Sequence, residues 1–138
     1  MITLITGPPC AGKSTLARER AAPTDTVVDF DDIALALGSP RRWMHSSQVI
    51  TVANHLMQAR LYELASEPDV TAWVIQAAPR AARRERLAAA LKARVWVLDP
   101  GIEVCLQRAA ARPYGTAAEI RKWYRLYTPS LLDEKVAA

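Results

Sequence analysis

The sequence predicts an α/β domain in which a parallel sheet is covered by helices on both faces, as a three-layer sandwich. Short apolar segments alternate with segments of helical character four times along the chain, which is the pattern of a sheet with about four parallel strands. A glycine-rich loop separates the first of these strands from the first helix. The 138 residues, of which 51% are hydrophobic, suit a single domain over residues 1–138.

The first half of the chain contains two apolar, β-branched runs that are typical of buried strands. Good helix formers follow the first run, and aspartates follow the second, where a helix N-terminus favours negative charge. A serine then precedes a long segment in which apolar side chains recur at helical spacing. The expected elements are strands over residues 2–6 and 26–30, and helices over 13–20, 31–37 and from Ser46 or Ser47 to about 66.

The second half repeats the alternation. The helix expected after the third strand carries an exposed run of arginines at positions 80, 83, 84 and 86. Thr116 is the expected cap of the last helix, with Glu119 completing a capping box. The tail after Pro129 is expected to be loosely held. The expected elements are strands over residues 71–75 and 94–98, and helices over 79–90, from Pro100 onward, and over 116–127.

Residues 7–14, GPPCAGKS, match the phosphate-binding pattern G-x-x-x-x-G-K-[ST] at every fixed position. The match follows a predicted strand and opens a predicted helix, which is the context the pattern requires. The amides of such a loop bind phosphates, its lysine reaches the β- and γ-phosphates, and its serine ligates Mg²⁺. We therefore expect a P-loop NTPase fold of the nucleotide-kinase type, with ATP and Mg²⁺ as cofactors. The expected nucleotide-binding residues of the loop are Gly7, Pro9, Cys10, Ala11, Gly12, Lys13, Ser14 and Thr15.

Three aspartates, Asp29, Asp31 and Asp32, follow the second predicted strand. Ligands of open parallel sheets bind outside the carboxyl ends of the strands, so these side chains face the same crevice as the P-loop. Transfer of a phosphoryl group to a hydroxyl needs a carboxylate that takes the proton and a group that helps to hold Mg²⁺. We interpret Asp31 as the base and Asp29, with Ser14, as a metal ligand. The alternative, that the residue only caps the next helix, is preferred for Asp32.

Arg108 and Arg112 lie four residues apart, on one face of the helix expected from Pro100, and Pro113 and Gly115 interrupt the chain after them. A basic helix end beside a flexible break suits a lid, here around residues 101–115, that closes over ATP. Arginines in such a lid neutralise charge on the transferred phosphoryl group. The alternative is a solvated helix face. Lys13, Asp31, Arg108 and Arg112 are thus the expected catalytic residues.

The composition limits the location of the protein. No apolar run approaches the roughly 20 residues needed to span a bilayer, and no basic region precedes the short apolar N-terminus as it would in a signal peptide. We expect a cytoplasmic protein without membrane association. Cys10 and Cys105 are expected to be free thiols. The net charge of +4 suits an anionic ligand.

With these motifs in place, the chain resembles the kinase domain of the polynucleotide 5′-hydroxyl kinase of T-even bacteriophages, within the group of small P-loop kinases that includes zeta-toxin-like enzymes. The resemblance covers nearly the whole chain, through GPPCAGKSTLARE, VDFDDI, AWVIQAAPRAARRERL, VWVLDPGIEVCLQRAAARP and EIRKWYRLY. It implies that Asp31 is the general base toward the acceptor hydroxyl. It also implies that Arg108 and Arg112 contact the ATP phosphates.

Two positions depart from the family pattern on the acceptor and metal side. The family has an arginine that holds the acceptor phosphate three residues after the catalytic aspartate, where this chain has Ala34. Arg41 or Arg42 is a possible substitute. The family's third strand ends in aspartate, where this chain has the neutral Gln76.

Three functions therefore stay open at the level of sequence. The first is an ATP-dependent kinase whose acceptor is a nucleic acid 5′-hydroxyl or a modified nucleotide. The second is a kinase for a nucleoside or another small molecule. The third, motivated by Ala34 and Gln76, is a nucleotide-dependent binding module without kinase activity.

Overall fold

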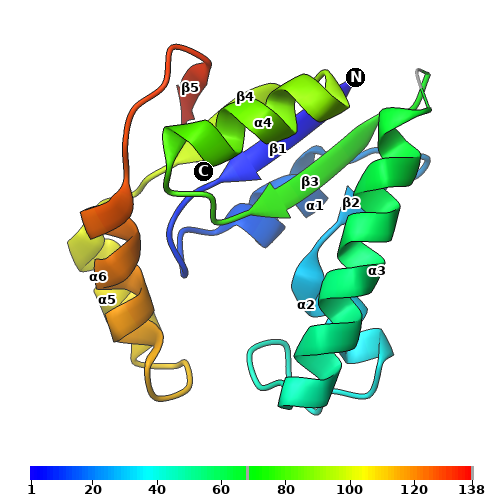
Figure 1. The fold of residues 1–138 in the computed structure, drawn as a ribbon. Helices are drawn as coiled ribbons and strands as arrows, with labels where there is room; N and C mark the ends of the chain where they lie inside the picture. Colours follow the sequence, from blue (N-terminus) through cyan, green and yellow to red (C-terminus); the bar gives the residue numbers. More distant parts are fainter. Residues whose placement is uncertain (68, 138) are drawn as a thin grey trace.

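The computed structural model describes residues 1–67 and 69–137. Five parallel strands form one sheet in the order β2-β3-β1-β4-β5, and helices cover both of its faces (Figure 1). The nucleotide-kinase-like α/β sandwich is thereby confirmed, with five strands instead of the expected four. The strands are β1 (Ile2–Thr6), β2 (Thr26–Val28), β3 (Ala72–Gln76), β4 (Arg94–Leu98) and β5 (Asp133–Val136).

Two cores, one on each face of the sheet, hold the helices. One contains apolar side chains of α3 and α4, and the other contains side chains of α1, α5 and α6. The strands alternate inward and outward along their length, so β1 contributes Leu4 to the first core and Ile5 to the second. The helices are α1 (Lys13–Arg20), α2 (Phe30–Ala36), α3 (Ser47–Ala65), α4 (Ala81–Leu91), α5 (Ile102–Ala109) and α6 (Thr116–Leu126).

The fifth strand, β5, corrects the expectation that the tail after Pro129 is loose. It pairs in parallel with β4, with Val95 opposite Asp133. Its residues are Asp-Glu-Lys-Val, and an edge strand of this polarity has no apolar run to reveal it in the sequence. Val136 packs against the second core, and polar contacts add to this, including a bond of 2.8 Å from Trp96 Nε1 to Glu134 Oε2.

Arg84 corrects a second expectation, because its side chain is completely buried and not part of an exposed run. It donates to both carboxylate oxygens of Asp133, at 2.9 and 2.7 Å. It also donates to the carbonyls of Ala78, Pro79 and Thr128. Five donors with these acceptors satisfy a guanidinium that has left water. Arg84 therefore ties the N-terminal end of α4 to the C-terminal segment.

The caps of α2 and α6 differ from those expected, whereas the cap of α3 does not. β2 ends two residues early, at Val28, and Asp29 caps α2 by accepting a hydrogen bond from the amide of Asp31. Gly115, with φ of 95°, caps α6 in place of Thr116, whose hydroxyl bonds the carbonyl of Pro113. Ser46 caps α3 as predicted.

Of the helices within the described residues, none has both the length and the apolar character needed to cross a bilayer.

Candidate active site

The P-loop joins β1 to α1 at the carboxyl edge of the sheet, as predicted. Gly7 is required by close packing, because a Cβ there would lie 2.2 Å from the carbonyl oxygen of Leu98 in β4. Gly12 precedes α1 with φ of 97°, a backbone conformation that residues other than glycine rarely adopt. These two glycines place the N-terminus of α1 directly against the sheet edge. The loop therefore has the backbone shape on which phosphate binding depends.

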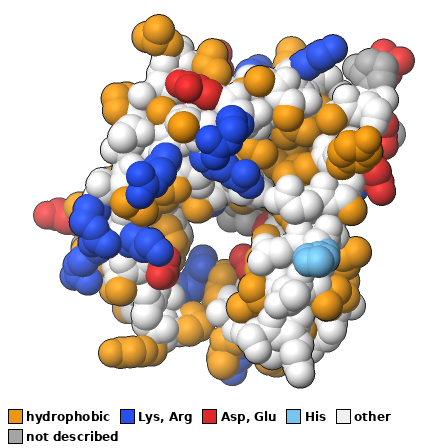
Figure 2. Space-filling view, in the orientation of Figure 1, with side chains coloured by type: hydrophobic (Ala, Val, Ile, Leu, Met, Phe, Trp, Pro, Cys, Tyr) orange, Lys and Arg blue, Asp and Glu red, His pale blue; other side chains and the backbone are white. Residues whose placement is uncertain are grey.

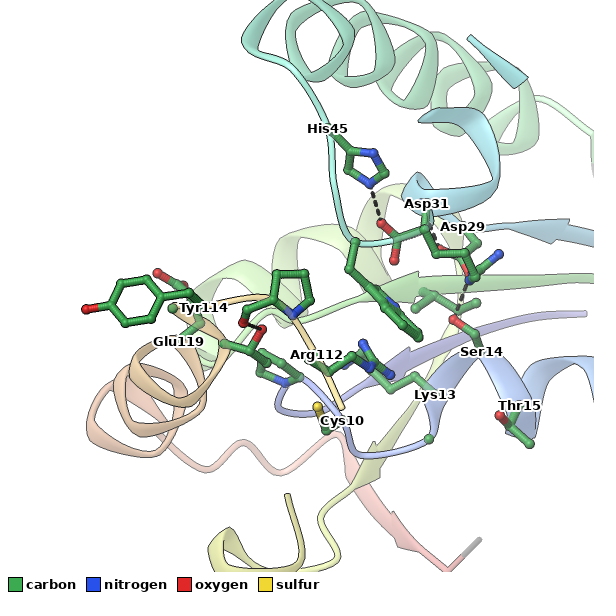
Figure 3. A pocket seen from close by; sticks show the side chains of 18 of the residues that line it. Cys10, Lys13, Ser14, Thr15, Asp29, Asp31, His45, Arg112, Tyr114 and Glu119 are labelled. Atoms are coloured by element: carbon green, nitrogen blue, oxygen red, sulfur yellow. Dashed lines mark hydrogen bonds and ion pairs between the residues drawn. The ribbon is translucent and has the colours of Figure 1, made fainter. Parts of the chain in front are cut away.

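Lys13 lies across this loop. Its ammonium group donates to the carbonyls of Gly7 at 2.9 Å and Pro8 at 2.7 Å. Burial lowers the pKa of Lys13 from 10.5 to about 8, against the opposing effect of the nearby Asp29. A lysine at this position of a P-loop is the one expected to reach phosphate oxygens, and Figure 3 shows Lys13 beside the loop.

The lowered pKa of Lys13 predicts that nucleotide binding depends on pH. Phosphates stabilise the ammonium form, so bound Lys13 keeps its proton to higher pH than free Lys13. Affinity for ATP is expected to fall above about pH 8, by up to about tenfold per pH unit. Titration of a fluorescent ATP analogue across this range measures the effect. A constant affinity would contradict the assignment.

The same pKa predicts the opposite trend for the stability of the nucleotide-free protein. Lys13 has a lower pKa in the folded chain, about 8, than its ordinary value of 10.5. The unfolded chain therefore binds more protons between these values, and the free energy of unfolding rises with pH across this window. Urea denaturation of wild type and Lys13→Met at both ends of the window isolates this contribution, which Met lacks.

Ser14 and Asp29, the two residues expected to ligate a metal, contact each other directly. The hydroxyl of Ser14 donates to Asp29 Oδ2 at 2.6 Å, a contact drawn in Figure 3. Asp29 is buried and also forms an ion pair with Arg42, whose guanidinium lies 2.7 Å from the same carboxylate oxygen. A hydroxyl and a carboxylate oxygen are the ligands that Mg²⁺ prefers. The donor set thus fits a magnesium ion beside the P-loop.

Asp31 lies in the first turn of α2 and is held from outside that helix. Nε2 of His45 lies 2.8 Å from Asp31 Oδ1, and Nδ1 of His45 lies 2.7 Å from the hydroxyl of Ser39. The imidazole is nearly buried, and its ring meets Phe30 edge to face. One carboxylate oxygen of Asp31 is therefore fixed by a neighbour that is itself fixed. Sequence reasoning missed His45, since a single histidine in a loop carries no pattern.

Arg42 was one of two possible substitutes for the acceptor arginine that Ala34 replaces. In the structure, the side chain of Arg42 is paired with two aspartates. Its guanidinium bonds Asp29 and Asp32, and Asp32 also accepts from Arg18 at 2.9 Å. Asp32 is consequently an ion-pair partner in the first turn of α2 and not the cap of that helix.

The two lid arginines do not share one helical face. α5 ends at Ala109, so Arg108 is in its last turn while Arg112 lies in the following turn. Arg108 donates to the carbonyl of Cys10 in the P-loop at 2.9 Å. The guanidinium carbon of Arg112 lies 3.5 Å from the centre of the Trp43 ring, across the site. Arg112 therefore lines the cavity beside the P-loop, whereas Arg108 contacts the backbone of the loop.

Two adjoining cavities lie at the carboxyl edge of the sheet and share part of their lining. The larger, of about 770 Å³, is lined by the P-loop, by Arg112 and by the segment from Pro113 to Glu119 (Figure 3). The smaller, of about 430 Å³, lies between α3 and the end of β3. The residues that line both cavities are Asp29, Asp31, His45 and Ile75.

Cys10 and Cys105 are free thiols, as predicted.

A P-loop at the carboxyl edge of a parallel sheet, with an acidic cluster after the edge strand β2, defines the P-loop class of α/β folds. Residues 2–126 match the sequence model described as an AAA domain, and the chain belongs to that family. Comparison with curated protein sequences gives no match.

Solved structures share this fold at low sequence identity. A gluconokinase from Sinorhizobium meliloti has a TM-score of 0.66 at 15% identity, over 98% of this chain and 81% of that chain. A shikimate kinase from Acinetobacter baumannii, in complex with shikimate, has a TM-score of 0.62 at 19% identity, over 99% and 82%. The Pnkp1/Rnl/Hen1 RNA repair complex has a TM-score of 0.64 at 15% identity, over 96% of this chain but 49% of the matched chain.

Proposed function

We propose that the protein is an ATP-dependent kinase that transfers the γ-phosphoryl group to a hydroxyl of an acceptor held in the smaller cavity. The observation that carries this proposal is the position of Asp31, where the cavity beside the P-loop meets the cavity between α3 and β3. A base there lies between a bound phosphate donor and a hydroxyl acceptor. An ATP-binding module without an acceptor would have no use for the second cavity or for a fixed carboxylate at the junction.

The residues divide the chemistry between them. Lys13 and the P-loop amides hold the phosphates, and Arg108 and Arg112 compensate the charge that spreads over the transferred group. Asp31 accepts the proton of the acceptor hydroxyl while the oxygen of that hydroxyl bonds to the γ-phosphorus. The bond from that phosphorus to the bridging oxygen breaks, and ADP leaves. Hydrogen bonding by His45 keeps the carboxylate of Asp31 oriented during this step.

Ser14 and Asp29 would hold Mg²⁺, which supplies charge compensation to the phosphates when it is bound. Gln76, at the end of β3, lines the smaller cavity and not the cavity beside the P-loop. The neutral residue therefore faces the acceptor, and its effect on metal binding is expected to be small. This arrangement makes the Gln76 departure compatible with phosphoryl transfer.

The acceptor proposed from the sequence resemblance is a nucleic acid 5′-hydroxyl or a modified nucleotide. The similarity of fold to the RNA repair complex is compatible with that acceptor, and the similarity to a gluconokinase and a shikimate kinase favours a small molecule equally. The cavity of about 430 Å³ is of the size that single small ligands occupy. A small-molecule acceptor is thus the second candidate.

The test is incubation with Mg²⁺ and γ-labelled ATP, separately with 5′-hydroxyl DNA, 5′-hydroxyl RNA, nucleosides, sugars and sugar acids, and without an acceptor. We expect label on one acceptor class. Release of free phosphate at the same rate in every tube would instead identify a nucleotide-dependent module and overturn the kinase proposal. A Lys13→Met sample controls for a contaminating kinase, because its label transfer should disappear.

A further inference from the structure

The smaller cavity has an uneven distribution of charge. Asp31 and His45 lie at the end that it shares with the P-loop cavity. Three neutral amides, Asn54, Gln58 and Gln76, lie along it together with apolar side chains of α3 and β3. Arg83, from the first turn of α4, is the one residue with a permanent positive charge among the described residues that line it.

Among the described residues, the guanidinium of Arg83 has no charged or hydrogen-bonding partner, and, unlike that of Arg112, it does not stack on an aromatic ring. Arg42 is engaged by Asp29 and Asp32, and the adjacent Arg84 is engaged by Asp133. Within the described part of the chain, Arg83 has neither an ion pair nor a side-chain hydrogen bond. Figure 2 shows lysine and arginine side chains gathered over α4 and α6, above and beside a hollow between α6 and α3. A half-buried, unpaired guanidinium at the wall of a cavity is suited to a ligand anion, which it binds in a planar, two-point contact.

We propose that Arg83 forms an anion-binding subsite of the acceptor cavity, so that the acceptor carries a phosphate or carboxylate group in addition to its reacting hydroxyl. The inference rests on the proposed kinase function for the identity of the cavity. The hydroxyl faces Asp31 at one end, the anion faces Arg83, and the amides of Asn54, Gln58 and Gln76 bond neutral polar groups between them.

The amide lining favours an acceptor rich in hydroxyl groups. An amide side chain both donates and accepts, and so matches a hydroxyl, whereas stacking of a base requires an open aromatic face. Phe30 and His45 are the aromatic side chains among the described residues that line the cavity, and they contact each other edge to face. Sugar phosphates and sugar acids combine hydroxyl groups with an anionic group. A nucleotide is a second class of ligand that carries a phosphate.

The test measures acceptor binding by calorimetry with the P-loop saturated by ADP, which keeps the added anions out of the phosphate loop. The probes are matched pairs that differ in the anion: glucose 6-phosphate and glucose, gluconate and glucose, and thymidine 3′-monophosphate and thymidine. We expect the anionic member of one pair to bind roughly 10- to 100-fold more tightly than its neutral partner. Arg83→Gln should abolish that preference. Arg86→Gln, an exposed arginine of α4 outside the cavity lining, should retain it.

Each outcome is informative. Equal binding within every pair, or a preference that survives in Arg83→Gln, would overturn the subsite. The pair that shows the preference identifies the source of the anion. Anion-dependent binding without transfer of label would retain the subsite and reject the kinase function. Transfer of label that is indifferent to both the anion and Arg83 would reject the subsite and retain the kinase.

Discussion

Replacement of Asp31 by asparagine is expected to lower kcat for phosphoryl transfer by about 100- to 10,000-fold, the range that a positioned general base contributes. An amide has the shape of the carboxylate but cannot accept the hydroxyl proton. Its oxygen still accepts a hydrogen bond from His45, which in the structure lies 2.8 Å from Asp31. Local structure is therefore preserved while the basic group is removed. Affinity for ATP should change little, because Lys13 and the loop amides hold the phosphates.

Asp32→Asn is the matched control for this experiment. Asp32 is adjacent in sequence and carries the same charge, but it pairs with Arg18 and Arg42 and does not line either cavity. Transfer by this variant should stay close to the wild-type rate. Single-turnover kinetics with labelled ATP, alongside equilibrium ATP binding, separate the chemical step from nucleotide affinity. Wild-type turnover by Asp31→Asn would remove Asp31 from the mechanism.

Replacement of Arg84 by methionine is expected to lower the free energy of unfolding by about 3–5 kcal/mol, the usual cost of removing one member of a buried ion pair. Methionine fills much of the same volume but leaves Asp133, whose side chain is 5% exposed, without its countercharge. The carbonyls of Ala78, Pro79 and Thr128 lose a donor as well. Urea denaturation measures the change through the midpoint of the transition.

Two further variants test that explanation. Arg86→Met removes an exposed arginine of the same helix and should change stability by less than about 0.5 kcal/mol. Adding Asp133→Asn to Arg84→Met removes the uncompensated charge and should recover part of the loss. An Arg84→Met protein as stable as wild type would show that the buried network contributes no net stability.

The Arg84 pair also has a predicted pH dependence. Burial alone would raise the pKa of Asp133, but the hydrogen bond and charge of Arg84, with the amide of Ser130, lower it below its ordinary value of 3.8. A lowered carboxyl pKa stabilises the folded chain above the ordinary value. This contribution is lost as the pH falls below it. The free energy of unfolding of the double variant, which has no carboxylate at position 133, should therefore fall less steeply with decreasing pH in this range than that of wild type.

Local patterns in the sequence were sufficient to predict the P-loop and its place between a strand and a helix. The P-loop is a contiguous motif, and its meaning depends only on the strand before it and the helix after it, both of which have clear periodicity. Ser14 and Asp29 were predicted as partners from the rule that carboxyl ends of parallel strands share one edge, and their oxygens lie 2.6 Å apart. β4 was predicted with its observed bounds because β-branched and aromatic residues form its centre.

Tertiary structure decided the features that depend on residues far apart in the chain. His45 reaches Asp31 from a loop, β5 is recognisable only beside β4, and four arginines in one segment look alike until packing buries Arg84 and leaves Arg83 at a cavity. A charged side chain is exposed by default, and only its neighbours in space can satisfy it in the interior. The P-loop and the acidic cluster thus follow from the order of residues. The partners of Asp31, Arg83 and Arg84 follow from which distant segments the fold brings together.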